Sequence, residues 1–156
     1  MRILEGLKSW LAEVEWKVET TVDEEDQTSS TVFDYQAGDD FECSGYFDTA
    51  EEAGLFKLYL YPKITVPEKQ LDAVHELVNA FNLGTAIGGF QLMADKRRVR
   101  YYSTVDVENA EFSPALIANI VSAADWQLKD KLPRLVGVCF GGMTPEQAME
   151  MEVEVE

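Results

Sequence analysis

Few side chains in this sequence have the chemistry of a catalytic group. His75 is the only histidine, and Cys43 and Cys139 are the only cysteines among 156 residues. His75 falls beside the apolar stripe of an expected helix, and no serine or cysteine in a nucleophile-elbow pattern accompanies it, so the sequence does not support a catalytic triad. Two cysteines form neither a disulfide framework nor a zinc-binding spacing, and we expect two reduced thiols in the core.

Carboxylates are the most abundant groups that could bind a ligand. They gather at residues 23–26, 39–40 and 51–52, where they could chelate a hard cation. The alternating oxygen ligands, central glycine and terminal glutamate of a calcium loop are absent, and runs of like charge are typical of solvated turns. A small-ligand site or an active site built on first-half carboxylates stays open as an alternative. No pair is marked as catalytic, so we assign no catalytic, metal-binding or cofactor-binding residue and expect neither a cofactor nor enzymatic activity.

A glycine-rich segment, Gly84, Gly88 and Gly89, follows an expected helix and precedes an expected strand. A phosphate-binding loop has the opposite order, because it joins a strand to a helix, and it usually carries Lys-Ser or Lys-Thr. We therefore interpret this segment as a helix terminator followed by a tight turn.

The only basic cluster consists of Lys96, Arg97, Arg98 and Arg100, on the expected turn and second arm of a hairpin. Such a cluster can contact a phosphate or an acidic partner. It can also pair with the acidic first half of the chain, within the molecule or between subunits, or it can be solvated and guard the sheet edge against aggregation.

Aromatic residues concentrate on the expected strands, where most of them belong to a sheet core. Tyr59, Tyr61 and Tyr102 are different, because the alternation of side chains places them on outward positions. Aromatic side chains and arginine dominate affinity at protein interfaces. We therefore predict that a partner binds at Tyr59, Tyr61, Tyr102, Arg97, Arg98 and Arg100.

The charge of the chain is large, with a net value of -16 and a pI near 4.3. It is also localised: residues 13–52 carry -13, residues 145–156 carry -5, and residues 53–144 carry only +1. A field of this sign opposes sequence-independent binding to nucleic acid or to an anionic membrane, so we expect neither partner. The last six residues alternate acidic and apolar side chains, as an edge strand does.

The spacing of apolar residues predicts the elements that must position these side chains. Residues 2–14 repeat at helical spacing, and so do the residues after Pro67, after Ser113-Pro114, over 132–140 and after Thr144. We expect Gly84 to end the second helix in a left-handed conformation. Alternating or β-branched segments predict strands at 16–22, 31–35, 41–47, 55–61, 89–94 and 99–107.

Strands that are grouped and joined by short turns favour an α+β fold with a mostly antiparallel sheet. We expect the N-terminal, middle and C-terminal helices to pack on that sheet. No linker or internal repeat interrupts the pattern, so residues 1–156 are expected to form a single domain. The N-terminus has no continuous apolar segment and no stretch reaches 18 apolar residues, so we expect a cytoplasmic protein.

Several segments from residue 55 onward together form a pattern that is typical of one protein family. They are Leu58 to Tyr61, the Pro67 helix ending in Asn79 to Asn82, Gly89 to Leu92, Val99 to Tyr101, Asp106 and Thr144 to Ala148. Through these segments the sequence resembles the YbjN family of bacterial sensory-transduction regulators. Further support comes from Asp130 and Leu135, and more loosely from the opening helix with Trp16 to Glu19. The chain departs from the family pattern in a long acidic stretch at 23–40, and in a hairpin turn without the expected glycine.

The resemblance implies the fold of type III secretion chaperones, which are small acidic α+β dimers that bind partner proteins. It implies a non-enzymatic, chaperone-like or regulatory protein-binding domain, and a homodimer. The acidic flank at 13–52 supports one alternative, in which the chain is a decoy that occupies the basic surfaces of other proteins, including nucleic-acid sites.

Overall fold

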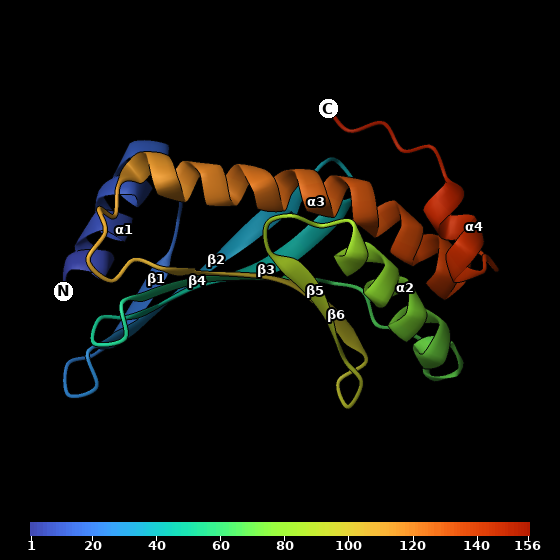
Figure 1. Ribbon diagram of the computed structural model, residues 1–156, viewed down its shortest axis with the longest axis horizontal. Coiled ribbons are helices and arrows are strands. Elements are labelled where there is room, and N and C mark those ends of the chain that lie inside the picture. Colours follow the sequence, from blue (N-terminus) through green and yellow to red (C-terminus); the bar gives the residue numbers. More distant parts are fainter.

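The alternation of apolar and polar side chains along the strands produces one six-stranded antiparallel sheet (Figure 1). The computed structural model describes residues 1–156. The strand order is β1-β2-β3-β4-β6-β5, so β4 and β6 lie inside the sheet and β1 and β5 form its edges. In chain order, the elements are α1 (Arg2–Val14), β1 (Glu19–Asp23), β2 (Thr28–Ala37), β3 (Phe41–Ala50), β4 (Leu55–Pro62), the 3₁₀ turn η1 (Glu68–Gln70), α2 (Leu71–Leu83), β5 (Gly89–Met93), β6 (Arg98–Asp106), α3 (Pro114–Phe140) and α4 (Pro145–Glu150).

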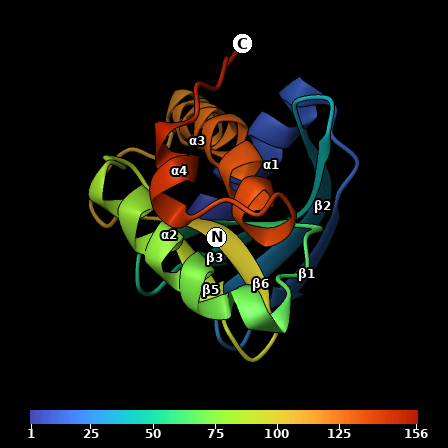
Figure 2. The ribbon, with the colours of Figure 1, turned by 90° about the vertical axis from the view of Figure 1, so that its right-hand side faces the viewer.

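The helices gather on one face of the sheet. Figure 1 shows α3 running along the length of the molecule above the strands, with α1 at one end and α2 and α4 at the other. The end-on view in Figure 2 shows the sheet below this layer, and no element covers its second face. The fold is therefore α+β with a mostly antiparallel sheet, which confirms the prediction. No helix combines the length and the apolar character needed to cross a membrane.

Aromatic rings fill the core between α1 and the first half of the sheet. The ring centroids of Phe33 and Phe47 lie 4.6 Å apart in a stacked arrangement, and Trp10 meets Trp16 at 5.1 Å. Gly45 faces Phe33 across the β2–β3 ladder. A Cβ atom at Gly45 would lie 2.2 Å from the Phe33 ring, so the absence of a side chain there makes room for the stack.

Several predicted strand boundaries differ from the observed ones. The strand expected at 16–22 begins only at Glu19, because Glu15 ends α1 with a φ of 56° and Trp16 turns into the aromatic core. The strands expected at 31–35 and 41–47 extend to ten residues each, since the two pair continuously from Thr28 opposite Ala50 to Ala37 opposite Phe41. Residues 151–156, whose alternation is typical of a strand, pair with no strand.

The prediction for Gly84 was wrong. Its φ is -104°, so it is not left-handed. The Thr85 hydroxyl donates to the Phe81 carbonyl at 2.7 Å, and this bond satisfies a helix-end carbonyl that a left-handed cap would otherwise serve. The segment 132–140 is not a separate helix but the second half of α3, which continues through Pro133.

A buried charge cluster attaches α4 to α3. The Arg134 guanidinium donates to the carbonyls of Ala148, Met149 and Met151 at 2.8 to 3.0 Å, and it pairs with Asp130 at 3.0 Å. A cation at these carbonyls compensates the unpaired C-terminal end of α4. Burial alone would raise the pKa of Asp130, but hydrogen bonds from Lys131 and Arg134 outweigh it and hold that pKa below its ordinary value.

We expect Gly45→Ala to lower the free energy of unfolding by about 1–3 kcal/mol, because the new methyl group must displace the Phe33 ring. Urea unfolding followed by tryptophan fluorescence measures the change. Ser44→Ala is the matched control, since Ser44 is the neighbouring residue on the opposite face, and its effect should stay below about 0.5 kcal/mol. Equal effects of the two substitutions would contradict this packing.

We expect Asp130→Asn to destabilise the protein by about 3 kcal/mol at pH 7, because it leaves two buried cations without their carboxylate. A carboxylate whose pKa is lowered by folding stabilises the fold at pH values above the ordinary aspartate pKa of about 4. This stabilisation is lost as the pH falls through the lowered pKa. The difference from wild type in urea unfolding should therefore shrink below pH 4. Glu146→Gln on the exposed side of α4 is the control, with an effect near 0.5 kcal/mol or less. A difference that does not depend on pH would refute the role of the Asp130 charge.

Candidate functional site

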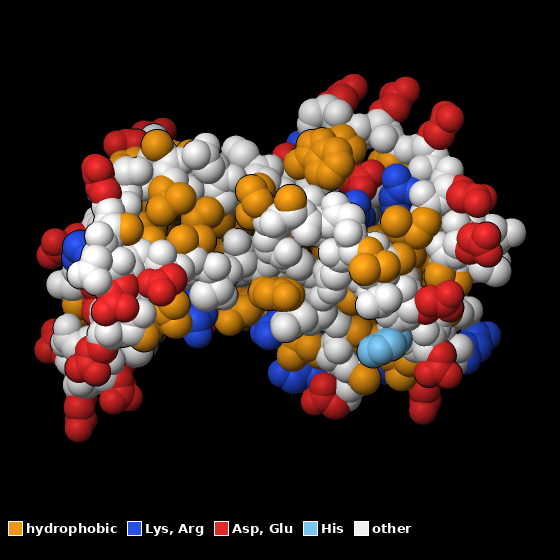
Figure 3. Space-filling view, in the orientation of Figure 1, with side chains coloured by type: hydrophobic (Ala, Val, Ile, Leu, Met, Phe, Trp, Pro, Cys, Tyr) orange, Lys and Arg blue, Asp and Glu red, His pale blue; other side chains and the backbone are white.

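The uncovered face of the sheet, which we call the open face, carries a row of large side chains across four strands. Val32 pairs with Tyr46, Tyr46 with Tyr59, and Tyr59 with Tyr102. Val32 is 41% exposed and the three tyrosines are half-buried. Figure 3 shows that the molecule is hollowed on this side, with basic side chains bordering the hollow and acidic ones at its outer left end.

A groove of about 520 Å³ lies in the basic half of the open face. It runs over β3, β4 and β6 and reaches the β5–β6 turn. The side chains that line it are outward-facing residues of those strands, together with one residue of the turn. They are Ser44, Tyr46, Asp48, Tyr59, Tyr61, Lys96, Arg98 and Arg100.

Arg100 is held in place by neutral groups on neighbouring strands. Its guanidinium carbon lies 4.5 Å from the centre of the Tyr59 ring. Its Nη1 donates to the Tyr61 hydroxyl at 2.7 Å, and its Nε donates to the Gln91 side-chain oxygen at 2.7 Å. Stacking and hydrogen bonding together fix the guanidinium in the wall of the groove.

Arg98 is also anchored by the neighbouring backbone. Its Nη2 donates to the Pro62 carbonyl at 2.7 Å, and its Nε is buried without a hydrogen-bond partner. Arg97 precedes it in the turn with a φ of 51°, the left-handed position for which a glycine was expected, and it does not line the groove. Of the six residues predicted to bind a partner, Tyr59, Tyr61, Arg98 and Arg100 line the groove, Tyr102 lies beside it and Arg97 lies outside it.

The cations of the groove are not neutralised by the protein. The molecule contains four ion pairs, formed by Lys63, Lys129, Lys131 and Arg134, and none involves Lys96, Arg98 or Arg100. The single carboxylate that lines the groove, Asp48, accepts a hydrogen bond from the Ser30 hydroxyl at 2.7 Å. In a chain of net charge -16, this groove is a local patch of uncompensated positive charge.

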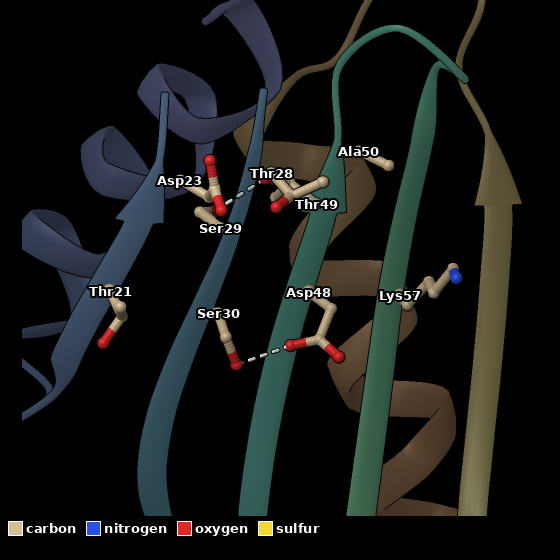
Figure 4. A pocket seen from close by; sticks show the side chains of 9 residues that line it. All are labelled: Thr21, Asp23, Thr28, Ser29, Ser30, Asp48, Thr49, Ala50 and Lys57. Carbon is tan, nitrogen blue, oxygen red and sulfur yellow. Dashed lines mark hydrogen bonds between the residues drawn. The ribbon is translucent and has the colours of Figure 1, made fainter. Parts of the chain in front are cut away.

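The acidic half of the open face has a different character (Figure 4). A shallow pocket of about 380 Å³ is lined mostly by serine and threonine residues of β1, β2 and β3, with Asp23, Asp48 and Lys57. Asp23 caps its own turn, because it accepts hydrogen bonds from the backbone of Glu25 and Asp26. Figure 4 shows the Lys57 ammonium pointing away from Asp48. The carboxylates therefore do not converge on a common point.

The other candidate groups do not line either of the two pockets described above. His75 is exposed on α2, and no three His, Cys, Asp or Glu side chains are grouped as metal ligands. Cys43 and Cys139 are buried free thiols, as predicted for core residues. Burial raises the pKa of Cys43 to about 12 and that of Cys139 to about 11, so both thiols stay protonated and unreactive near neutral pH.

Sequence reasoning missed Ser44, Tyr46 and Asp48 as members of the groove. The signal was present in the alternation of the third strand, since Cys43 and Phe47 point inward and the residues between them must point outward. Ser44 and Tyr46 fall inside the strand predicted at 41–47, and only Asp48 falls beyond its predicted end.

A double-mutant cycle tests how Arg100 is positioned. We expect Tyr59→Ala and Arg100→Ala to show a coupling of about 0.5–1 kcal/mol in urea unfolding, because the ring and the guanidinium are in contact. Tyr46→Ala with Arg100→Ala is the control cycle, since Tyr46 instead meets the Tyr61 ring. Equal coupling in both cycles would contradict a specific stacking interaction.

Comparisons with known proteins identify the family of the chain and two distantly similar solved structures. No curated protein sequence matches the chain. A chain in the solved structure of the HopA1–SchA chaperone–effector complex is 14% identical, with a TM-score of 0.44, over 80% of this chain and 88% of that chain. A chain in the crystal structure of the ExsC–ExsE complex is 15% identical, with a TM-score of 0.32, over 81% of this chain and 95% of that chain.

A family model matches most of the chain. Residues 4–133 match the YbjN family, which is described as "Putative bacterial sensory transduction regulator". This range includes most of α1, the whole sheet and most of α3, and therefore every residue of the groove. The chain belongs to the YbjN family.

Proposed function

We propose that this protein is a non-enzymatic regulator or chaperone that binds a protein partner on the open face of its sheet. The observation that carries the proposal is the groove, where half-buried tyrosines and two anchored arginines lie on a face that no element covers. Tyrosine and arginine are the side chains that most often provide binding energy at protein interfaces. The family description, a sensory-transduction regulator, is consistent with this role.

The proposal includes a cytoplasmic homodimer in which residues 1–156 act as one domain. Trp126 and Phe140 on α3 are 51% and 62% exposed, on the helical side of the molecule. Burying these side chains against a second copy would leave the open face of the sheet available to the partner.

The acidic turn at 23–26 supports a second candidate function. These four residues are exposed at the tip of the β1–β2 hairpin. A decoy of basic protein surfaces would bind through this turn rather than through the tyrosines.

Site-specific photo-crosslinking in cells tests where a partner binds. We expect a photoreactive phenylalanine analogue at Tyr102, on the open face beside the groove, to capture a discrete partner. The same analogue at Glu76, which is exposed on α2, should capture none. The Tyr102 adduct should fall at least about tenfold with Tyr59→Ser, because an aromatic anchor in such a surface contributes more than 1.4 kcal/mol.

The same experiment separates the two functions. Neutralising Asp23, Glu24, Glu25 and Asp26 should leave the Tyr102 adduct intact if the partner binds in the groove. An adduct that survives Tyr59→Ser but disappears with the neutralised turn would favour the decoy. Equal capture at Glu76 and Tyr102 would refute both.

A further inference from the structure

We infer that the groove binds a carboxylate-bearing, extended segment of the partner protein. The inference rests on the proposed function, to which it adds the chemistry of the partner. The residues that would recognise the segment are Lys96, Arg98 and Arg100, with Tyr61 as a further donor.

The charge of the groove favours an anionic ligand. The chain has 29 acidic residues, yet none of them forms an ion pair with Lys96, Arg98 or Arg100. Lys96 is exposed, whereas Arg98 and Arg100 are half-buried and held by neutral groups. Such guanidinium groups keep their positive potential and favour an anion from outside the molecule. Lys63 in the next loop differs, because it pairs with Glu42 at 3.3 Å.

Arg98 and Arg100 retain N–H donors that form no hydrogen bond within the protein. A guanidinium carries five N–H donors, and Arg100 uses two of them, toward Tyr61 and Gln91. Arg98 uses one toward Pro62, and its buried Nε has no partner. The Tyr61 oxygen accepts from Arg100, so its own proton remains to be donated. Carboxylates are the acceptors that bind guanidinium groups in pairs of parallel hydrogen bonds.

The spacing of the two arginines along β6 fits a ligand with an extended backbone. Arg98 and Arg100 are two residues apart on β6 and project from the same face. Two residues along a strand span about 7 Å, which is also the distance between alternate side chains of an extended peptide. A segment with carboxylates at alternate positions can therefore meet both arginines, while the rings of Tyr46, Tyr59 and Tyr61 cover its remaining side chains.

The carboxylates on the open face favour a short acidic protein segment over a nucleic acid as the ligand. Asp48 lines the groove itself, and Asp34 and Glu42 lie on the same face toward β2. A nucleic acid carries charge along its whole length and would extend toward these carboxylates. A short acidic segment can place its charges at the arginines alone.

Fluorescence anisotropy with labelled synthetic peptides and the full chain tests the inference. The probe has the sequence Gly-Ser-Glu-Val-Glu-Val-Glu-Ser-Gly, and a second peptide has glutamine in place of each glutamate. We expect the glutamate peptide to bind, and to bind more weakly as the salt concentration rises. Arg100→Gln and Arg98→Gln should each lower the affinity about tenfold, which corresponds to about 1.4 kcal/mol.

Arg97→Gln is the matched control, because it removes the same charge from the same hairpin but outside the groove. It should change the affinity less than about twofold, which corresponds to about 0.4 kcal/mol. Arg100→Lys keeps the charge without the fork of donors and should fall between wild type and Arg100→Gln. Thermal unfolding of each variant shows that the fold is retained.

Three results would overturn the inference: equal binding of the glutamate and glutamine peptides, equal loss with Arg97→Gln and Arg100→Gln, or tighter binding of oligothymidylate than of the glutamate peptide. If crosslinking at Tyr102 still captures a partner in any of these cases, the proposed function stands and only the acidic chemistry of the partner is wrong. If crosslinking also fails, both proposals fall.

Discussion

The structure depends on one constraint, the period-two alternation of side chains in a sheet that is covered on a single side. Large apolar residues such as Phe47, Phe56 and Leu58 all point toward the helices, because only that face can be removed from water. The opposite face must be compatible with solvent, and it carries tyrosines, hydroxyl groups and charges instead. Core and candidate site are therefore two sides of the same strands, and a shift of register by one residue would exchange them.

This coupling gives the groove its rigidity. Tyr59 lies between the buried residues Leu58 and Leu60 on β4, and Arg100 lies between Val99 and Tyr101 on β6. The backbone at each groove position is fixed by side chains that are buried on the other face. A site on strands is positioned more accurately than a site on loops, which suits recognition through a few anchored donors.

The sequence predicted the fold class and the outward tyrosines because both follow from local alternation. It could not predict that Trp16 leaves the first strand for the aromatic core, since that depends on ring contacts with Phe33, Phe47 and Trp10. Alternation within the strand already places Tyr46 outward, but the neighbours that make it part of the groove follow from the pairing of β3 with β4. Arg97 takes a left-handed turn position that local propensity assigns to glycine. The clamp of Arg134 on the carbonyls of α4 is likewise a tertiary contact with no local pattern.

The effect of the charged side chains on a partner depends on where the fold places them. The acidic hairpin turn and the basic groove lie at opposite ends of one hollowed face, so a partner meets a gradient of potential rather than a uniformly negative surface (Figure 3). Hydroxyl-radical footprinting, in living cells and on the purified chain, tests the central claim that this face is the binding surface. If a partner covers the open face, Tyr59 and Tyr102 are labelled in the purified chain and protected in cells. The exposed residues His75 and Leu83 on α2 are then labelled equally in both conditions. Equal labelling of Tyr59 and Tyr102 in both conditions would contradict it.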